Sequence, residues 1–269
     1  LSGGEGKDLL NGGTSDQVLG DTANYEYLDT TTNKIVVDLT LSSDQAVVYN
    51  GNTASTTDID QLVSIENING TKNDDTITGD NNKNILKGNA GQDLISGNAG
   101  NDTIYGGTGN DILDGGLDDD SLYSEEGDDT LTGSLGKDLL NGGSSVLLGD
   151  TVNYDYLDTT TYKVVVDLTS TSNQAIVYNG NTASTSDIDQ LVDIENINGS
   201  INDDTMTGNS SNNSLIGNSG NDLFYGSEGI DIIDGGTGTY IDIANYSTLN
   251  KRIILTTNDN GSTSNTYTI

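Results

Sequence analysis

The sequence lacks several residue types on which folding or catalysis often depends. Its 269 residues include no cysteine, proline, histidine or tryptophan. The absence of cysteine excludes disulfide bonds and thiolate metal sites, and the absence of histidine removes the usual zinc ligand and the usual general base. We therefore expect a protein that is not an enzyme.

Basic and apolar residues are also scarce. Nine Lys and Arg stand against 42 Asp and Glu, giving a formal net charge of -33. Nucleic acid is excluded as a partner because a phosphate backbone needs a basic surface. Only 32% of the residues are hydrophobic, so one large globular core is not expected, and no apolar run reaches the length of a membrane span. Because negative charges repel, a compact state needs bound cations.

A long internal repeat organises the chain. The stretch from Gly20 to Asp80 returns, with mostly conservative changes, at Gly149 to Asn209, and a third copy begins at Asp242 and includes residues 251–255. The sequence opens with neither a start Met nor a signal peptide. We interpret it as an excerpt of a longer protein.

A shorter period of nine residues runs between the long copies. Eight consecutive units extend from Gly70 to Asn141, four more from Gly199 to Asp234, and one opens at Gly3. The shared pattern is G-x-x-G-x-D-x-U-x, in which U is a large aliphatic residue. The glycine-rich half suits a tight turn, and the other half suits a short strand with one inward side chain.

A coil made of two such units would place alternate strands in two facing parallel sheets. The inward aliphatic residues would then stack into a thin core, formed in the first array by Leu86, Ile95, Ile104, Leu113, Leu122, Leu131 and Leu140. The predicted fold class is all-β: a parallel β-solenoid with two nonapeptides per coil, which the strands of the spacers between arrays continue.

The sixth-position residues of this solenoid would form two rows, one on each edge. One row would hold Asp75, Asp93, Asp111 and Asp129, and the other Asn84, Asp102, Asp120 and Asp138. Strands lie about 4.8 Å apart, where two carboxylates repel by roughly 0.9 kcal/mol in water. A hard divalent cation between coils turns this repulsion into attraction, since it binds two carboxylates and completes its coordination shell with turn carbonyls. Ca²⁺ fits better than Mg²⁺, which demands a small octahedron and keeps its waters.

The nonapeptide resembles the RTX, or hemolysin-type, calcium-binding repeat. The segment running from DTANY through VVDL and IENINGT to NDDTITG resembles the spacers between arrays in large bacterial RTX proteins. The resemblance implies a parallel β-roll that binds several Ca²⁺ ions. It also implies export in an unfolded state by a one-step, type I secretion machine, with folding outside the cell when calcium is met.

The resemblance further implies the calcium ligands, which are the sixth-position residues. They are Asp8, Asp75, Asp93, Asp102, Asp111, Asp120, Asp129, Asp138, Asp204, Asp222 and Asp231. Asn84 and Asn213 hold the same position without a charge. The fourth-position Gly is replaced in five units, by Asn73, Asn82, Asp118, Asn202 and Ser211. Asn and Asp tolerate left-handed backbone better than most residues, but we expect weaker sites in these units.

The ends of the arrays add three candidate ligands, which are Asp21, Asp150 and Asp242. Each follows the last regular sixth-position Asp of its array by one nonapeptide plus a short insertion. We expect these three residues to hold the sixth position of a distorted last turn.

The spacers carry β-like runs at residues 35–39, 46–49 and 62–68, separated by polar loops. We interpret them as wider coils or hairpins, and a ligand surface is the alternative. Their tyrosines are read as packing residues and are Tyr25, Tyr27, Tyr154 and Tyr156. Asp58 and Asp60, with Asp187 and Asp189, could add a calcium site, but two acids in a polar loop are more often solvated.

These patterns divide the chain into six segments. Residues 1–21 end one array, 22–69 form a spacer, and 70–150 form the array of eight nonapeptides with its distorted last turn. The remaining segments are the second spacer at 151–198, the second array at 199–242 and a truncated third spacer at 243–269.

The leading functional hypothesis is a structural segment of a secreted bacterial cell-surface protein, a surface layer or an adhesin, that folds and stiffens on binding extracellular Ca²⁺. Its partners would be calcium and either other copies of itself or cell-surface polysaccharide. The near-identical duplication favours this over a toxin or protease tail.

Two other classes remain open. A calcium-dependent carbohydrate-active or carbohydrate-binding module would need acids aligned with exposed aromatics, of which Tyr105, Tyr123 and Tyr225 give a sparse version. An ice- or surface-binding solenoid is suggested by Thr pairs at 76–78, 130–132 and 205–207, but three isolated pairs do not make a flat threonine array.

Overall fold

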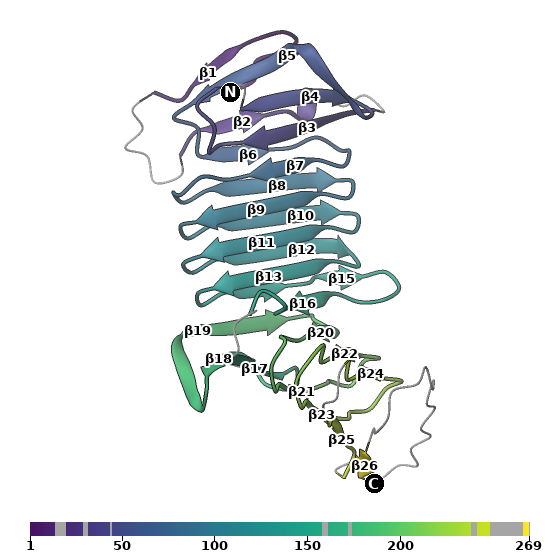
Figure 1. The fold of residues 1–269 in the computed structure, drawn as a ribbon. Coiled ribbons are helices and arrows are strands. Elements are labelled where there is room, and N and C mark those ends of the chain that lie inside the picture. Colours follow the sequence, from purple (N-terminus) through teal and green to yellow (C-terminus); the bar gives the residue numbers. More distant parts are fainter. Residues whose placement is uncertain are drawn as a thin grey trace. The chain divides into compact units, whose positions relative to one another are not determined.

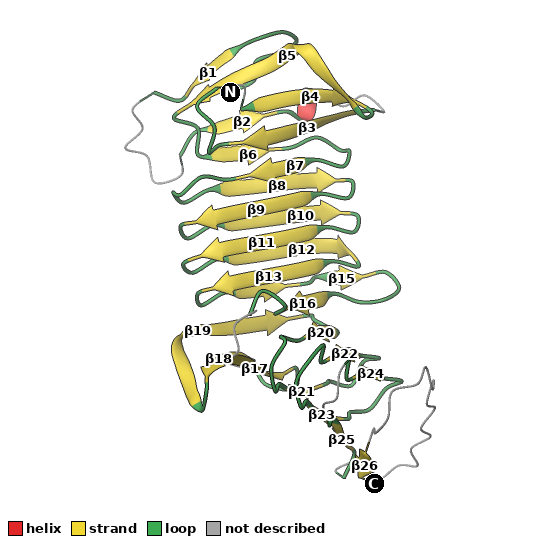
Figure 2. Ribbon diagram, in the orientation of Figure 1, coloured by secondary structure: helices red, strands yellow, loops and turns green. Residues whose placement is uncertain are grey.

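The structure is a computed structural model that describes residues 1–13, 20–28, 32–43, 45–157, 161–171, 174–237, 241–247 and 266–268. The chain forms two compact units, Leu1–Asp150 and Thr151–Ile269. Strands dominate both units (Figure 1), and the helical structure of the described ranges is one short 3₁₀ turn, η1 (Glu26–Leu28), drawn in red in Figure 2. No helix within these ranges is long and apolar enough to cross a membrane.

The described strands of the first unit are short, and the longest of them lies in the spacer. They are β1 (Leu9–Asn11), β2 (Thr22–Asn24), β3 (Asn33–Asp38), β4 (Ala46–Asn50), β5 (Thr53–Val63), β6 (Asn67–Asn69), β7 (Thr76–Thr78), β8 (Ile85–Ala90), β9 (Leu94–Ala99), β10 (Thr103–Thr108), β11 (Ile112–Leu117), β12 (Ser121–Gly127), β13 (Thr130–Leu135), β14 (Leu139–Asn141) and β15 (Ser144–Ser145).

The second unit repeats the same order of elements. Its strands are β16 (Thr151–Asn153), β17 (Tyr162–Asp167), β18 (Ala175–Asn179), β19 (Thr182–Val192), β20 (Asn196–Asn198), β21 (Thr205–Thr207), β22 (Ser214–Ile216), β23 (Leu223–Tyr225), β24 (Ile232–Asp234), β25 (Ile243–Asn245) and β26 (Thr266–Thr268). The proposed third-copy strand at residues 251–255 lies outside the described residues.

Alternate strands of the first array pair in parallel to form two facing sheets. One sheet contains β7-β9-β11-β13 and the other β6-β8-β10-β12-β14. Neighbouring strands of a sheet are offset by two nonapeptides, because Ile104 pairs with Leu86 on one side and with Leu122 on the other. Successive strands of the array point in opposite directions in Figure 1 because consecutive strands belong to opposite sheets. The predicted parallel solenoid with two nonapeptides per coil is confirmed.

The core of the array is one aliphatic side chain wide. All seven predicted core residues, from Leu86 to Leu140, are 0% exposed, and Ile77 extends the stack. The side chains on either side of each core residue point outward, as strand geometry requires. So thin a core stabilises each coil only modestly, since a fully buried aliphatic side chain contributes about 1.5–3 kcal/mol.

The spacer of the first unit is a meander that joins the solenoid at both edges. Strands β3, β4 and β5 pair antiparallel, while β3 pairs in parallel with β7 and β5 pairs in parallel with β1. On the other sheet, β6 lies between β2 and β8. The spacer strands therefore continue the solenoid, as predicted. The antiparallel strands β3, β4 and β5 correspond to the hairpins that the sequence offers as one reading of the β-like runs.

Among the described residues, the two largest fully buried side chains lie in the spacers. Tyr25 and Tyr154 are 1% and 0% exposed, so these two tyrosines pack as predicted. Tyr27 is 39% exposed and donates a hydrogen bond from its hydroxyl to the Gly4 carbonyl at 2.8 Å, so it lies on the surface. In the second unit, β17, β18 and β19 form the same antiparallel meander, and β17 pairs in parallel with β21.

Candidate metal sites

The sixth-position side chains are joined by hydrogen bonds along each edge of the solenoid. The backbone N–H of each residue donates to Oδ1 of the residue one coil later, as in Asp93 to Asp111 at 2.8 Å and Asp102 to Asp120 at 2.7 Å. The structure thus forms both predicted rows of the first array, from Asp75 through Asp93, Asp111 and Asp129 to Asp150, and from Asn84 through Asp102 and Asp120 to Asp138.

The second array has the same two rows in shorter form. Asp204, Asp222 and Asp242 form one row, and Asn213 and Asp231 form the other. Asp150 and Asp242 accept the row hydrogen bonds from the backbone N–H groups of Asp129 and Asp222. Both pairs are further apart in sequence than the regular pair of Asp111 and Asp129. In the first array the inserted residues, including Val146, Leu147 and Leu148, are exposed while Asp150 keeps its place in the row, which is the geometry expected for a distorted last turn.

Several turns between strands have left-handed backbone at their second and fourth positions. Gly107 and Gly109 have φ of 120° and 126° in one turn, and Asn89 and Gly91 have φ of 79° and 118° in another. The sequence pattern singled out the fourth position and not the second, and the first-position glycine serves a different purpose. A Cβ built on Gly88 would lie 2.1 Å from Asp93 Oδ2 and 2.7 Å from the Gly106 carbonyl oxygen. The first Gly therefore makes room for oxygen atoms to converge.

The second oxygen of many row carboxylates is buried without a hydrogen-bond donor. Oδ1 is used by the row, but Oδ2 has no partner in a set of residues that includes Asp93, Asp102, Asp111, Asp120 and Asp222. These side chains are at most 2% exposed. Burying a charged group costs free energy unless it is paired. Binding of a cation or a proton at each of these oxygens would therefore stabilise the folded state.

The pKa values of these carboxyls reflect the missing partner. Burial, together with the neighbouring Asp75 and Asp111 carboxylates, raises the pKa of Asp93 to about 8 against the lowering effect of the Asp75 N–H. Burial likewise raises the pKa of Asp111 to about 7 and that of Asp222 to about 8. A bound cation would act against both causes, because an opposite charge nearby favours the ionised form.

The residues present fit Ca²⁺. The available donors are carboxylate and carbonyl oxygens, which hard cations prefer, and flexible turns suit the variable six- to eight-fold shell of Ca²⁺. Among the described residues no three acidic side chains converge on one point. A site formed by these residues would combine one or two row carboxylates with turn carbonyls.

Four units that lack the fourth-position Gly have a different turn. Asn73, Asn82, Asn202 and Ser211 are not left-handed, so their turns do not reproduce the backbone of a fourth-position Gly. Asp118 does adopt it, with φ of 76°. In the four units the second-position N–H donates to the sixth-position side chain instead, as in Thr71 to Asp75 Oδ2 at 2.6 Å.

The rows continue into the first spacer through Asp60, which the sequence offers as an additional calcium ligand, and through Glu66, which the sequence pattern did not identify. Asp60 Oδ1 accepts from the Asp8 N–H at 3.1 Å, and Glu66 Oε2 accepts from the Asp21 N–H at 2.8 Å. Asp8 Oδ2 and Asp21 Oδ2 are buried without hydrogen-bond partners. A local signal does exist, because both acids stand two residues before an inward aliphatic, in Asp60-Gln61-Leu62 and Glu66-Asn67-Ile68, as the sixth-position Asp does.

The spacer acids lie on strands and not in a solvated loop. Asp58 and Asp60 belong to β5, and Asp187 and Asp189 to β19. Asp60 and Asp189 are each 1% exposed and accept hydrogen bonds from the hydroxyls of Tyr25 and Tyr154 at 3.1 Å and 2.9 Å. The expectation that these acids are solvated is therefore wrong, because the strand periodicity turns them inward.

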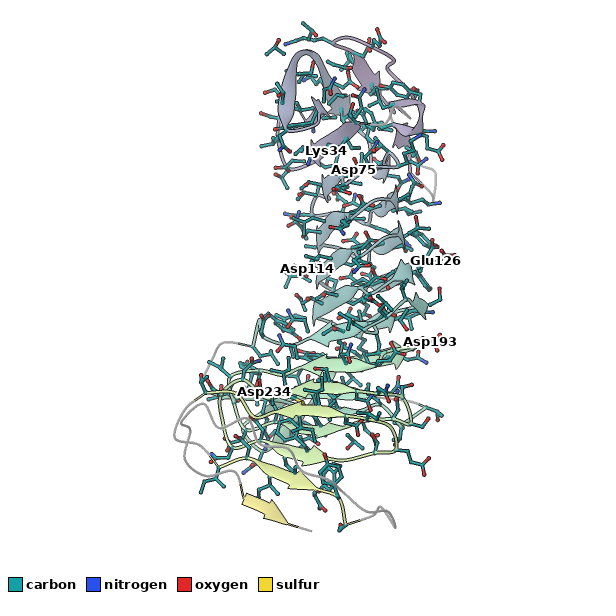
Figure 3. All side chains as sticks on the ribbon, turned by 90° about the vertical axis from the view of Figure 1, so that its right-hand side faces the viewer. Lys34, Asp75, Asp114, Glu126, Asp193 and Asp234 are labelled. Atoms are coloured by element: carbon teal, nitrogen blue, oxygen red, sulfur yellow. The ribbon has the colours of Figure 1, made fainter. Side chains whose placement is uncertain are left out.

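Other acidic side chains project outward from the array. Figure 3 shows Asp114 and Glu126 on opposite sides of it, and Asp75 close to Lys34 where β3 meets β7. Burial raises the pKa of Asp75 to about 6, and the nearby Lys34 ammonium is among the groups that lower it. The acids thus divide into an inward set in the rows and an outward set that carries much of the net negative charge.

Comparison with known proteins agrees with this geometry. A sequence profile for the RTX calcium-binding nonapeptide repeat matches residues 1–19, 64–95, 87–122, 114–145 and 198–233, together just over half of the chain. No curated protein matches the chain. The matched segments are those in which the sixth-position rows run along two facing parallel sheets. The chain therefore belongs to the RTX calcium-binding nonapeptide repeat family, and its arrays form a calcium-binding β-roll.

Proposed function

We propose that this chain is a structural segment of a secreted bacterial cell-surface protein, which folds and stiffens when its nonapeptide turns bind extracellular Ca²⁺. The observation that carries the proposal is the set of buried Oδ2 atoms without donors, at residues such as Asp93, Asp111 and Asp222. These atoms oppose folding without a cation and favour it with one.

The thin core makes calcium the deciding contribution in the arrays. Extracellular calcium modules bind with dissociation constants of about 10⁻⁴ to 10⁻³ M. Each site filled at a 100-fold excess over its dissociation constant adds about 2.7 kcal/mol. Several such sites outweigh the repulsion within the rows, whereas at low calcium the same acids keep the arrays unfolded. This difference suits a chain exported unfolded.

A structural role is favoured over catalysis by the use made of the acids. Inward carboxylates such as Asp102 and Asp120 each accept a row hydrogen bond through Oδ1, and their Oδ2 atoms are buried away from any substrate. The duplicated order of spacer and array suits a protein that gains length by repetition, as surface layers and adhesins do. Partners would be other copies of the chain or surface polysaccharide.

The experiment is a calcium titration of the chain followed by far-UV circular dichroism, with magnesium as the matched control. We expect a cooperative gain of β-structure with Ca²⁺ and little change with Mg²⁺ at equal concentration. Full β-structure in chelator, or an equal response to Mg²⁺, would contradict the proposed mechanism. Adhesion or lattice formation by the calcium-loaded chain would then be measured on cell-surface polysaccharide and by electron microscopy.

A further inference from the structure

The first two nonapeptides of each array are built differently from those that follow. They are residues 70–78 and 79–87 in the first array and 199–207 and 208–216 in the second, and we name their loops the closed turns. The open turns are those of Asp93, Asp102, Asp111, Asp120 and Asp222, whose Oδ2 atoms have no donor. The contrast appears in both copies.

In the first closed turn of each array, protein donors engage both carboxylate oxygens. Asp75 Oδ2 accepts from Thr71 N at 2.6 Å, and Asp75 Oδ1 accepts from Ile35 N at 2.8 Å. The second array matches this, since Asp204 Oδ2 accepts from Ser200 N at 2.7 Å and its Oδ1 from Val164 N at 2.8 Å. A carboxylate with several donors is stable in the charged form without a cation.

In the second closed turn of each array, an amide takes the place of a carboxylate and its cation. Asn84 Oδ1 accepts from Asp80 N at 2.9 Å, while Asn84 Nδ2 donates to the Glu66 carbonyl at 2.7 Å. Asn213 repeats both contacts, with Asn209 N and the Glu195 carbonyl, at 2.9 Å and 2.6 Å. The amide N–H thus faces a backbone carbonyl of the previous coil without any positive ion.

The first closed turn of each array is hydrogen-bonded to the preceding spacer, through Ile35 N in one copy and Val164 N in the other. The Asp75 turn is tied to β3 of the first spacer through Ile35 N, and Asn73 Nδ2 donates to the Asn33 carbonyl at 2.6 Å. The spacer buries Tyr25, Val37 and other large side chains, whereas each nonapeptide of the first array buries one aliphatic side chain. The part of each copy best able to fold without calcium is therefore continuous with the closed turns.

We infer that each spacer and its two closed turns form a calcium-independent seed, on which the open turns fold in sequence as they bind Ca²⁺. This inference rests on the proposed function, because it assigns the calcium response to the open turns alone. A seed offers the next coil a sheet edge already in register, which reduces the entropic cost of starting a new array.

The test is hydrogen exchange with mass spectrometry on the full chain, in chelator and across a calcium titration. We expect peptides from 65–87 and 194–216 to be protected in chelator, and peptides from 97–141 to gain at least tenfold protection with calcium. Equal exchange of both sets in chelator, with protection gained at one calcium concentration, overturns the seed while leaving calcium-driven folding intact. A chain that shows no calcium response anywhere overturns both.

A matched pair of variants tests the amide directly. Asn84→Asp replaces the Nδ2 donor that faces the Glu66 carbonyl by an oxygen, so we expect protection of 79–87 in chelator to fall at least tenfold. Asn81→Asp adds the same charge to an exposed position of the same turn and should leave protection unchanged. Equal effects of the two changes would overturn the role of Asn84, and Asn213→Asp repeats the test in the second array.

Discussion

At the scale of single residues, one atom separates a turn that needs calcium from one that does not. An Asp in an open turn accepts the row hydrogen bond through Oδ1, as Asp111 does from Asp93 N, whereas Asn84 Oδ1 accepts from Asp80 N within its own turn. The second Asp oxygen repels the neighbouring carbonyls, whereas the Asn amide donates to one, as in Asn84 to Glu66. The same substitution should therefore have opposite effects with and without calcium.

Asp111→Asn makes this prediction specific. In calcium, the variant loses one ligand, and we expect its free energy of unfolding to fall by about 2–3 kcal/mol, the contribution of one saturated site. In chelator, it loses a buried charge between Asp93 and Asp129, and we expect its β-structure to rise. Thermal unfolding by circular dichroism measures both.

The control for this change is Asp119→Asn in the neighbouring unit. It removes the same charge at an exposed position and keeps the Oδ1 acceptor that Lys137 N uses at 3.0 Å. Equal effects of the two substitutions would show that net charge alone, and not ligation, sets the calcium response.

The raised pKa values predict how acid acts on the calcium-free arrays. In the folded state the pKa of Asp93 is about 8 and that of Asp111 about 7, while an unfolded Asp has a pKa of about 3.9. Protonation therefore stabilises the folded form fully below pH ~4, and this stabilisation is lost as pH rises through 7 to 8. Circular dichroism in chelator should show more β-structure at pH 5 than at pH 8.

With calcium present the same protons compete with the ion. We expect the calcium concentration at half-transition to rise as pH falls from 8 to 6. A midpoint independent of pH would mean that the row carboxyls are not the groups that take up calcium.

At the scale of elements, the array and the spacer are stabilised by different means. The array has a one-residue core and turns that depend on left-handed backbone, whereas the spacer has an antiparallel meander with buried tyrosines such as Tyr25. Changes in turn geometry should therefore damage the array more than the spacer.

Gly107→Ala tests the turn geometry. Gly107 has φ of 120°, and a Cβ there would lie 1.8 Å from the Asn89 carbonyl oxygen of the previous coil. We expect a loss of about 3 kcal/mol in the calcium-loaded state, at the upper end for backbone strain, measured as a fall in Tm.

Gly51→Ala is its control in the turn between β4 and β5. Gly51 has φ of 60° with no atom within 4 Å of a Cβ, so the cost should be limited to about 1 kcal/mol of left-handed strain. A larger loss at Gly51 than at Gly107 would contradict the turn geometry described above.

At the scale of the whole molecule, the net charge of -33 determines how expanded the calcium-free chain is. In chelator, self-repulsion among the acids expands the arrays, and calcium removes charge from the rows while leaving the outward acids in solvent. We expect the radius of gyration from small-angle X-ray scattering to fall when calcium replaces chelator. Magnesium at the same ionic strength is the control, and equal compaction by both ions would indicate general screening.

The sequence by itself determined the solenoid, its coil of two nonapeptides, its core and its rows. A period of nine with one inward aliphatic and one acid leaves a single register that buries every aliphatic from Leu86 to Leu140. The ligand type followed as well, because a chain without Cys or His offers a metal mainly oxygen.

The tertiary structure alone decided which turns have an unpaired oxygen. Asp75 and Asp93 occupy the same position of the pattern, yet Asp75 Oδ1 accepts from Ile35 in the spacer, and Asp93 Oδ2 has no donor. The inward orientation of Asp60 and Glu66 was likewise decided by strand pairing with β1 and β2. The nonapeptide pattern records the spacing of residues along the chain, whereas hydrogen-bond donors come from strands distant in sequence, so donor satisfaction could only be read from the folded structure.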